Sequence, residues 1–328
     1  MALPREVDEL IQPKQSTVYH YTDASGLLKI VQSNELWATE SHGMNDVAEI
    51  EQGWAFIVEW LERQNPKDPT VADLRSAAGS GADDYGYTYF CCASIAADDA
   101  NQWRNYADGG RGFAIALKAA PTYGVVTEAS PPELPENPDA LERTIPGWTE
   151  FLNEYEATPW RKVLYEPDEK RRVLDSYLVA AQAERESALD PKGVDEVEWS
   201  AARAMLLGEY RADLEALARL MKGPGFAGER EVRLVVSTFD SRYAGLRAGR
   251  YGITLYQRLA LAEGGEETSS RAPRYNVGVG ESTGLLPIEE VWCGPLVNLK
   301  TNTRPIMASL RRGGHKDVRV IGSSVPMR

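Results

Sequence analysis

One stretch constrains the fold of this chain more than any other: residues 226–236, Phe-Ala-Gly-Glu-Arg-Glu-Val-Arg-Leu-Val-Val. It follows a Gly-Pro-Gly break at 223–225, where a long helical pattern ends. Side chains alternate across a strand, so Glu229, Glu231 and Arg233 share one face and the aliphatic residues share the other. Two interpretations follow. Either this is an edge strand with a solvated charged face, or the charges are buried with partners, because burying unpaired charges is costly.

Length and charge narrow the classes of protein that this chain represents. With 328 residues it buries a sizeable core, in one large domain or two. The net charge of −13 argues against general binding to nucleic-acid phosphates, although it does not exclude a local basic groove. The three cysteines, two of them adjacent, give neither a disulfide framework nor metal-ligand spacing. No signal peptide or transmembrane run is found, which predicts a reduced, cytoplasmic protein with no membrane partner.

The order of hydrophobic patterns predicts an α+β fold, with a helical segment interrupting one mostly antiparallel sheet assembly. The pattern at 148–221 is mostly helical, with breaks near Pro159 and Pro191, whereas 41–46, 127–148 and 263–273 are predicted loops. Strands are predicted at 17–22, 35–39, 87–93, 113–117, 232–238, 251–256, 291–295 and 318–321, and helices at 26–33, 47–63, 71–78, 100–106 and 302–312.

Several common catalytic motifs are absent from the sequence. It contains no P-loop, no complete dinucleotide-binding glycine pattern and no Gly-x-Ser-x-Gly elbow. Its three histidines and three cysteines do not form a zinc signature, so no metal site is predicted. What remains is polar groups near strand ends. His20 fits a satisfied, half-buried residue of an aromatic strand, whereas Arg104 and Arg111 are either solvated or bidentate partners of a diphosphate.

A set of short motifs, weak singly, carries a family resemblance as an ordered group. The set resembles a widespread bacterial family whose domain is labelled as of unknown function, and that family looks similar to the ADP-ribosyltransferase superfamily, which uses NAD. The motifs are Tyr19-His-Tyr-Thr22, Leu36-Trp37 with Met44-Asn-Asp46, Trp103-x-x-Tyr106 before Gly112-Phe-Ala-Ile115, Phe226-x-x-Glu-x-Glu-x-Arg233, Val291-x-x-Gly-Pro295 and Ser324-Val-Pro-Met-Arg328.

The resemblance implies a single domain over residues 1–328, built on a pair of small, mostly antiparallel sheets, with 120–225 as a variable, largely helical insertion. It also implies roles for particular residues. Glu231 becomes the catalytic carboxylate, with Glu229 orienting or deprotonating the acceptor, and we expect Glu231 to face the same hollow as His20. The NAD-binding residues implied are His20, Tyr21, Ser94, Arg104, Tyr106, Arg111 and Arg233, with either Tyr21 or Tyr106 facing the nicotinamide. Ser94 is the nearest counterpart of the Ser-Thr-Ser segment that other members have and this chain lacks.

The implied activity is ADP-ribosyl transfer from NAD to a protein or nucleic acid, or NAD hydrolysis, in bacterial defence or toxicity. A carboxylate beside the ribose stabilises the oxocarbenium-like cation that forms when nicotinamide leaves, and this step requires no metal. Two alternatives stay open. One is a catalytically silent nucleotide-binding sensor, and the other is an interaction module in which the charged strand is a solvated edge.

Overall fold

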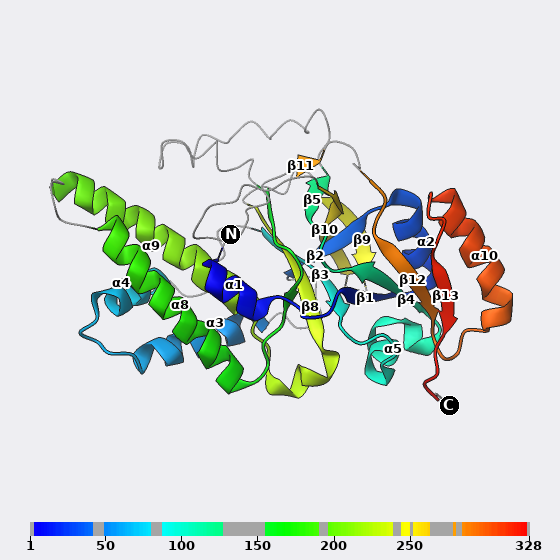
Figure 1. Cartoon of the computed structure of the whole chain (residues 1–328), viewed down its shortest axis with the longest axis horizontal. Helices are drawn as coiled ribbons and strands as arrows, with labels where there is room; N and C mark the ends of the chain where they lie inside the picture. Colours follow the sequence, from blue (N-terminus) through cyan, green and yellow to red (C-terminus); the bar gives the residue numbers. More distant parts are fainter. Residues whose placement is uncertain are drawn as a thin grey trace.

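A computed structural model describes residues 3–41, 49–79, 87–126, 155–189, 196–238, 244–249, 252–262, 278–279 and 284–326. The motif residues 44–46 and most of the predicted loops at 41–46, 127–148 and 263–273 lie outside these ranges. Figure 1 shows the sheet in the middle of the molecule, with α3, α4, α8 and α9 at one end and α2 and α10 at the other. Among the described residues, no helix is both long enough and apolar enough to cross a bilayer.

Helices and strands are interleaved in the first third of the chain, as predicted, with α3 and α4 as two successive helices. The helical elements are α1 (Arg5–Ile11), α2 (Ala24–Ser33), α3 (Glu49–Glu62), α4 (Pro69–Ala78), α5 (Ala100–Tyr106), η2 (Asp108–Gly110), α8 (Pro167–Ala188), α9 (Glu196–Ala218), η3 (Pro224–Glu229) and α10 (Leu299–Arg312). The strands are β1 (Thr17–Thr22), β2 (Leu36–Glu40), β3 (Tyr87–Ser94), β4 (Phe113–Lys118), β5 (Tyr123–Val126), β6 (Tyr155–Ala157), β7 (Arg161–Lys162), β8 (Glu231–Thr238), β9 (Gly245–Gly249), β10 (Gly252–Leu261), β11 (Gly278–Val279), β12 (Ile288–Cys293) and β13 (Arg319–Gly322).

Two aspartates begin helices by capping free backbone N–H groups. The Asp23 carboxylate accepts a hydrogen bond of 2.6 Å from the N–H of Gly26 at the start of α2. Asp99 does the same for Asn101 and Gln102 at the start of α5, at 2.8 and 3.3 Å. The predicted start of α5 at 100 is confirmed, whereas α2 begins at Ala24, two residues before the predicted start at 26.

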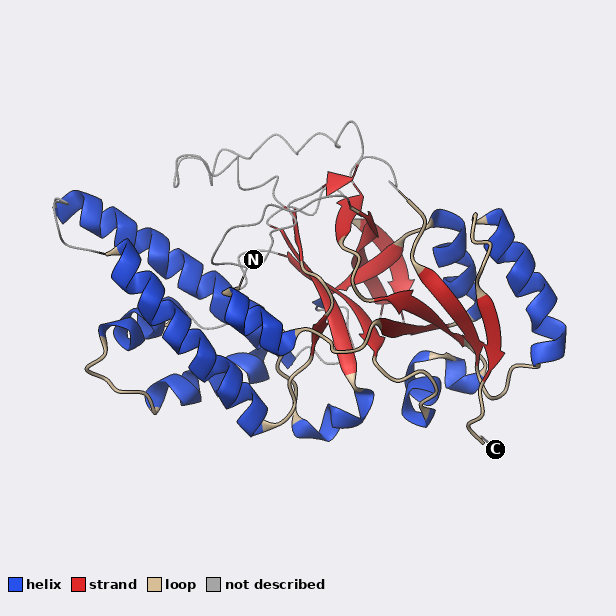
Figure 2. Ribbon diagram, viewed as in Figure 1, coloured by secondary structure: helices blue, strands red, loops and turns tan. Residues whose placement is uncertain are grey.

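The α+β prediction is confirmed, and most strand pairs are antiparallel, the parallel ones among the described strands being β5 with β11 and β12 with β13. The predicted pair of separate sheets is replaced by one hydrogen-bonded sheet of 13 described strands (Figure 2). The segment 120–225 contains the helices α8 and α9, but it also contributes β5, β6 and β7 to that sheet. The region before α8 that was predicted to be helical is therefore partly strand.

The sheet divides into two arms at β3. Strand β8 pairs with β3 along its whole length, from Tyr87↔Thr238 to Ser94↔Glu231, and so occupies one edge of β3. The other edge is shared. β2 pairs with it at Tyr89 and Phe90, whereas β1 pairs with it at Ser94. One arm continues from β2 through β10 and β5 to β11, and the other from β1 through β4 and β12 to β13.

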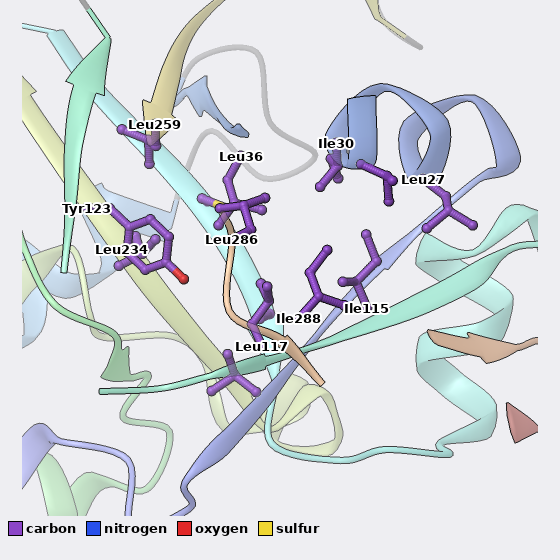
Figure 3. Packing of buried hydrophobic residues seen from close by; sticks show 14 of the residues in the cluster. Leu27, Ile30, Leu36, Ile115, Leu117, Tyr123, Leu234, Leu259, Leu286 and Ile288 are labelled. Carbon is purple, nitrogen blue, oxygen red and sulfur yellow. The ribbon is translucent and has the colours of Figure 1, made fainter. Parts of the chain in front are cut away.

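The hydrophobic core has two main parts, one on each face of β8. Val232, Leu234 and Val236 join the cluster that fills the space between the arms and helices α2 and α10. Figure 3 shows this packing, in which Leu27 and Ile30 of α2 meet Ile115 of β4. Phe90 and Val235, from the other face, join a second cluster with the helices α1, α3, α4, α8 and α9.

The helices α8 and α9 form a hairpin whose two ends meet beside β8. The N–H of Leu164 donates to the carbonyl of Leu220 at 2.7 Å, and the N–H of Lys222 donates to the carbonyl of Leu164 at 3.0 Å. These bonds close the hairpin at its base, where Leu164 and Met221 form an isolated parallel bridge. The base of the hairpin therefore fixes the residues on either side of it.

Helix α3 crosses α9 at a glycine. A Cβ atom built on Gly53 would lie 2.2 Å from the carbonyl oxygen of Ala218, so only glycine allows this approach. Gly208, on an exposed part of α9, has nothing within 4 Å of the equivalent position. The two helical glycines thus differ in their surroundings, not in their secondary structure.

We expect Gly53→Ala to lower the free energy of unfolding by about 1–3 kcal/mol, because the helices must move apart. The matched variant Gly208→Ala should raise it by up to about 1 kcal/mol, since alanine is the better helix former and meets no neighbour. Urea unfolding followed by circular dichroism measures both values. Equal effects of the two substitutions would contradict the close crossing at Gly53.

Candidate functional site

The charged face of β8 is buried, so the interpretation as a solvated edge strand is wrong. Strand β8 has β3 on one edge and β6 and β7 on the other. Glu231 is 7% exposed and Arg233 is 1% exposed. Ser94 lies opposite Glu231 and Cys92 opposite Arg233, so these four residues lie on one face of the sheet. The predicted alternation is confirmed for Glu231 and Arg233, but the prediction for Glu229 is wrong, because Glu229 ends the 3-10 helix η3 and precedes the strand.

Arg233 uses its whole guanidinium group in this buried position. Its Nε is 2.8 Å from Oε1 of Glu231, and its Nη2 is 3.0 Å from Oε2 of the same carboxylate. The Nη2 atom also pairs with Glu49, the first residue of α3, while Nη1 donates to the carbonyl of Arg219 at 2.9 Å. The guanidinium carbon lies 4.8 Å from the centre of the Phe90 ring. The cation is thus paired, hydrogen-bonded and stacked, as burial requires.

Lys222 joins the carboxylates into one group. Its Nζ lies 2.6 Å from Glu229, 2.7 Å from Glu49 and 3.4 Å from Glu231. It also lies 4.6 Å from the centre of the Phe226 ring. We call Glu49, Lys222, Glu229, Glu231 and Arg233 the ionic cluster. It contains three carboxylates and two cations, so it carries one net negative charge when all five groups are ionised.

The ionic cluster controls the protonation of its members. Burial alone would raise the pKa of Glu231, but the adjacent Arg233, assisted by Lys222, outweighs burial and lowers that pKa to about 2. Burial would lower the pKa of Lys222, yet Glu231 and Glu229 raise it above its usual value. The buried carboxylate of Glu231 is therefore charged at neutral pH.

One pair of side chains connects the ionic cluster to solvent. The Tyr106 hydroxyl donates a 2.6 Å hydrogen bond to Oε1 of Glu229. Tyr106 is 37% exposed, whereas the Glu229 side chain is 14% exposed. Burial, followed by the hydrogen bond to Glu229, raises the pKa of Tyr106, so it remains a phenol and a donor. Tyr106 and Glu229 form the rim of the cluster.

The backbone that carries Glu229 is held from two directions. Ser94, which is fully buried, donates its hydroxyl to the Glu229 carbonyl at 2.8 Å. The side-chain amide of Gln102 donates to the same carbonyl at 2.8 Å. One residue beyond Arg230, which adopts a left-handed conformation with φ 47°, the N–H of Glu231 donates to the Tyr165 hydroxyl at 3.0 Å. Ser94 thus positions the acidic segment and is not open to a ligand.

His20 lies apart from Glu231. Tyr19 pairs with Ser94, which pairs in turn with Glu231, so the alternation of side chains puts His20 on the opposite face of the sheet. The Nδ1–H of His20 donates to the carbonyl of Cys92 at 2.8 Å. Burial lowers the pKa of His20 and outweighs the opposing effect of the hydrogen bond to Cys92, so the neutral ring is favoured. The expectation that His20 and Glu231 face one hollow is therefore wrong.

Of the two candidate tyrosines, Tyr21 is part of the core. It is 7% exposed, its hydroxyl donates to the Ala96 carbonyl at 2.8 Å, and its ring packs edge-on against Trp103 at 4.8 Å. Trp103 in turn donates to Asp98, which also binds the hydroxyls of Ser323 and Ser324. The sequence motifs that contain Tyr21, Trp103 and Ser324 therefore pack together in the folded chain. Of the two candidate tyrosines, Tyr106 is the one exposed to solvent.

The two predicted diphosphate-binding arginines do not enter the ionic cluster. Arg104 lies on α5 and Arg111 directly follows η2, and both side chains are exposed. They belong to the same short segment as Tyr106. They are accordingly near the rim in sequence, but the structure does not bring them into contact with it.

Sequence reasoning missed two members of the ionic cluster. Lys222 stands just before the Gly-Pro-Gly break, which marks a chain reversal but not a partner for the next strand. Glu49 has no distinguishing local signal, since it lies within an ordinary amphipathic helix pattern. The half-buried Cys92, beside Glu231, is not a reactive nucleophile, because desolvation and the nearby carboxylate raise its pKa well above the usual value.

Because the folded-state pKa of Glu231 is lowered from 4.5 to about 2, its charge stabilises the fold above pH 4.5. This contribution, about 3 kcal/mol, is lost as the pH falls from 4.5 towards 2. We expect Glu231→Gln to lower the free energy of unfolding by about 3 kcal/mol at neutral pH, with a smaller difference from wild type in acid. The exposed Glu59→Gln serves as the control. Parallel pH profiles of wild type and Glu231→Gln, measured by urea unfolding, would contradict the lowered pKa.

Comparison with known proteins gives one match. Residues 102–234 match the family described as "Protein of unknown function (DUF2971)". The matched range begins within α5 and ends within β8, so it includes Tyr106, Glu229, Glu231 and Arg233 as well as the α8–α9 hairpin. No curated protein and no solved structure matches the chain. The match supports the expected resemblance to a family of unknown function.

Proposed function

We propose that this chain cleaves the nicotinamide–ribose bond of NAD and passes ADP-ribose to an acceptor or to water, at the Tyr106–Glu229 rim. The observation that carries the proposal is a carboxylate, Glu229, that is bound to a partly exposed tyrosine on one side and to a buried charge network on the other. Such a rim offers an aromatic ring for stacking and an acidic oxygen for a sugar hydroxyl.

The chemistry requires negative charge beside the ribose. When nicotinamide leaves with the electrons of the C–N bond, the sugar becomes an oxocarbenium-like cation. Glu229 would accept a hydrogen bond from a ribose hydroxyl and stabilise this cation, and the charged Glu231 behind it adds to the negative potential. The acceptor oxygen then bonds to the sugar carbon, and its proton passes to Glu229 or to solvent. Arg104 and Arg111, exposed on the same segment as Tyr106, are the cations that would meet the diphosphate.

The proposal changes the roles expected of Glu229, Glu231 and His20, and it selects Tyr106 from the two candidate tyrosines. Glu229 takes the substrate-facing role expected of Glu231, because Glu231 is buried, whereas Glu229 is bonded to the partly exposed Tyr106. Tyr106 takes the nicotinamide-facing role, since Tyr21 is buried in the core. His20, on the opposite face of the sheet, has a structural role.

A second candidate function is a catalytically silent nucleotide-binding or interaction module. The observation that favours it is that the Glu231 carboxylate already has its partners: it is 7% exposed and paired with both Arg233 and Lys222. In this alternative the ionic cluster stabilises the fold, and the rim binds a partner without breaking a bond. The two functions differ in whether nicotinamide is released.

Glu229→Gln distinguishes them, because it keeps the size of the side chain and removes the charge. For the enzyme, we expect purified wild type to release nicotinamide from NAD and Glu229→Gln to release it about 100-fold more slowly. Tyr106→Ala should weaken NAD binding by about ten-fold through loss of stacking. Chromatographic detection of nicotinamide gives the rates, and calorimetric titration with NAD gives the affinities.

The control variants are Glu59→Gln and Tyr87→Phe, which change an exposed carboxylate and an exposed tyrosine on α3 and β3. Both should behave as wild type. A parallel reaction with labelled NAD and a bacterial lysate supplies protein and nucleic-acid acceptors. NAD binding without release or labelling would support the silent module, and an absence of binding, release and labelling would refute the NAD proposal.

A further inference from the structure

A small cavity lies on the helical side of the sheet, apart from the rim. It is lined by β8, by β7 with the link that precedes it, and by the end of α9 with the residues that follow. Its lining residues are Thr158, Arg161, Ala216, Arg219, Leu220, Val235 and Ser237. Its volume of about 10 Å³ is enough for one small particle.

Arg161, one of the residues that line this cavity, has an unmet hydrogen-bond donor. Arg161 is 1% exposed, and its Nη2 pairs with Oδ1 of Asp8 at 2.6 Å. Its Nε–H has no hydrogen-bond partner. A buried N–H of a charged group that lacks an acceptor is costly, so the molecule gains if an acceptor occupies the adjacent space.

Two hydroxyl groups on the cavity wall also have hydrogens to donate. The Thr158 oxygen accepts the N–H of Val235 at 3.0 Å, and the Ser237 oxygen accepts Nη1 of Arg219 at 3.0 Å. In the part of the chain that the structure describes, no acceptor receives either hydroxyl hydrogen. Both oxygens are held by the bonds that they accept, so their hydrogens are free to turn to a third partner.

We propose that this cavity is a binding site for a monatomic anion, chloride in solution. The buried Nε–H of Arg161 lacks an acceptor, Thr158 and Ser237 have hydroxyl hydrogens that can donate to one, and Arg219 lines the same space. A water accepts at most two of these bonds and must place two hydrogens of its own, whereas chloride accepts all of them and brings a compensating charge. Phosphate and sulfate are too large for the volume.

The anion would stabilise the neighbourhood of the ionic cluster. Arg161 lies opposite Arg233 on the adjacent strand, and the carbonyl of Arg219 accepts a hydrogen bond from Arg233. An anion that holds Arg161 and Arg219 in place therefore also holds the partner of Glu231. This site does not depend on the NAD proposal, because none of its residues belongs to the rim.

The test is thermal unfolding in a chloride titration at constant ionic strength, with gluconate as the balancing anion. We expect the melting temperature of wild type to rise with chloride, and the chloride concentration at half-effect to increase by about ten-fold or more in Ser237→Ala. Arg161→Lys keeps a cation for Asp8 and removes the Nε–H, so it should have the same effect. Ser76→Ala, which removes an exposed hydroxyl on α4, should leave the titration unchanged.

Crystals soaked in bromide give an independent measurement. An anomalous peak in the cavity, within hydrogen-bond reach of Arg161 and Ser237, is the expected result. Identical melting curves in chloride and gluconate, or a cavity without an anomalous peak, would overturn the proposal. If Arg161→Lys fails to fold, Ser237→Ala still separates a specific anion effect from a general effect of salt.

Discussion

The buried guanidinium of Arg233 is the interaction on which the rest of the site depends. It joins β8 to the start of α3 through Glu49, to the end of α9 through the Arg219 carbonyl, and to its own strand through Glu231. Removing one charged partner from such a buried group destabilises the fold by more than the intact group stabilises it, because an unpaired charge then remains in the core. The ionic cluster is consequently a requirement for docking the helices on the sheet, and any catalytic use of Glu229 rests on it.

The division of the sheet at β3 explains both the position and the state of His20. Where β1 leaves β3, the carbonyl of Cys92 loses its place in the strand ladder, and the His20 imidazole supplies the missing donor. The neutral ring fits this role, since burial lowers its pKa. A histidine on a first strand thus has a sufficient structural reason here. On the face of the sheet that carries Glu231, the side chain bonded to the acidic segment is therefore Tyr106, through Glu229, and not a histidine.

The sequence predicted the elements well and the long-range arrangement partly. Alternation along 231–236 correctly separated the charged side chains from the aliphatic ones, because this property is local to one strand. The relation of His20 to Glu231 depended on the register of three strands, and a shift of one residue reverses the face of every side chain. Glu49 comes from α3, far from β8 in the sequence, and Lys222 lies in the irregular segment between α9 and η3, so no local pattern could identify them. The same holds for the single sheet, since the sharing of one edge of β3 by two strands is decided by tertiary packing.

The closed base of the α8–α9 hairpin has a mechanical consequence. Leu164 is bonded to both Leu220 and Lys222, so the chain leaves for the two long helices and returns within one hydrogen-bonded step. Residues added or removed at the far tip would leave the spacing between Tyr165 and Lys222 unchanged. In contrast, a movement that tilts the two helices acts on the hydrogen-bonded residues at their base, and Lys222 is one of these residues. A change in the tilt of the hairpin would therefore change the distances between Lys222 and the three carboxylates of the ionic cluster.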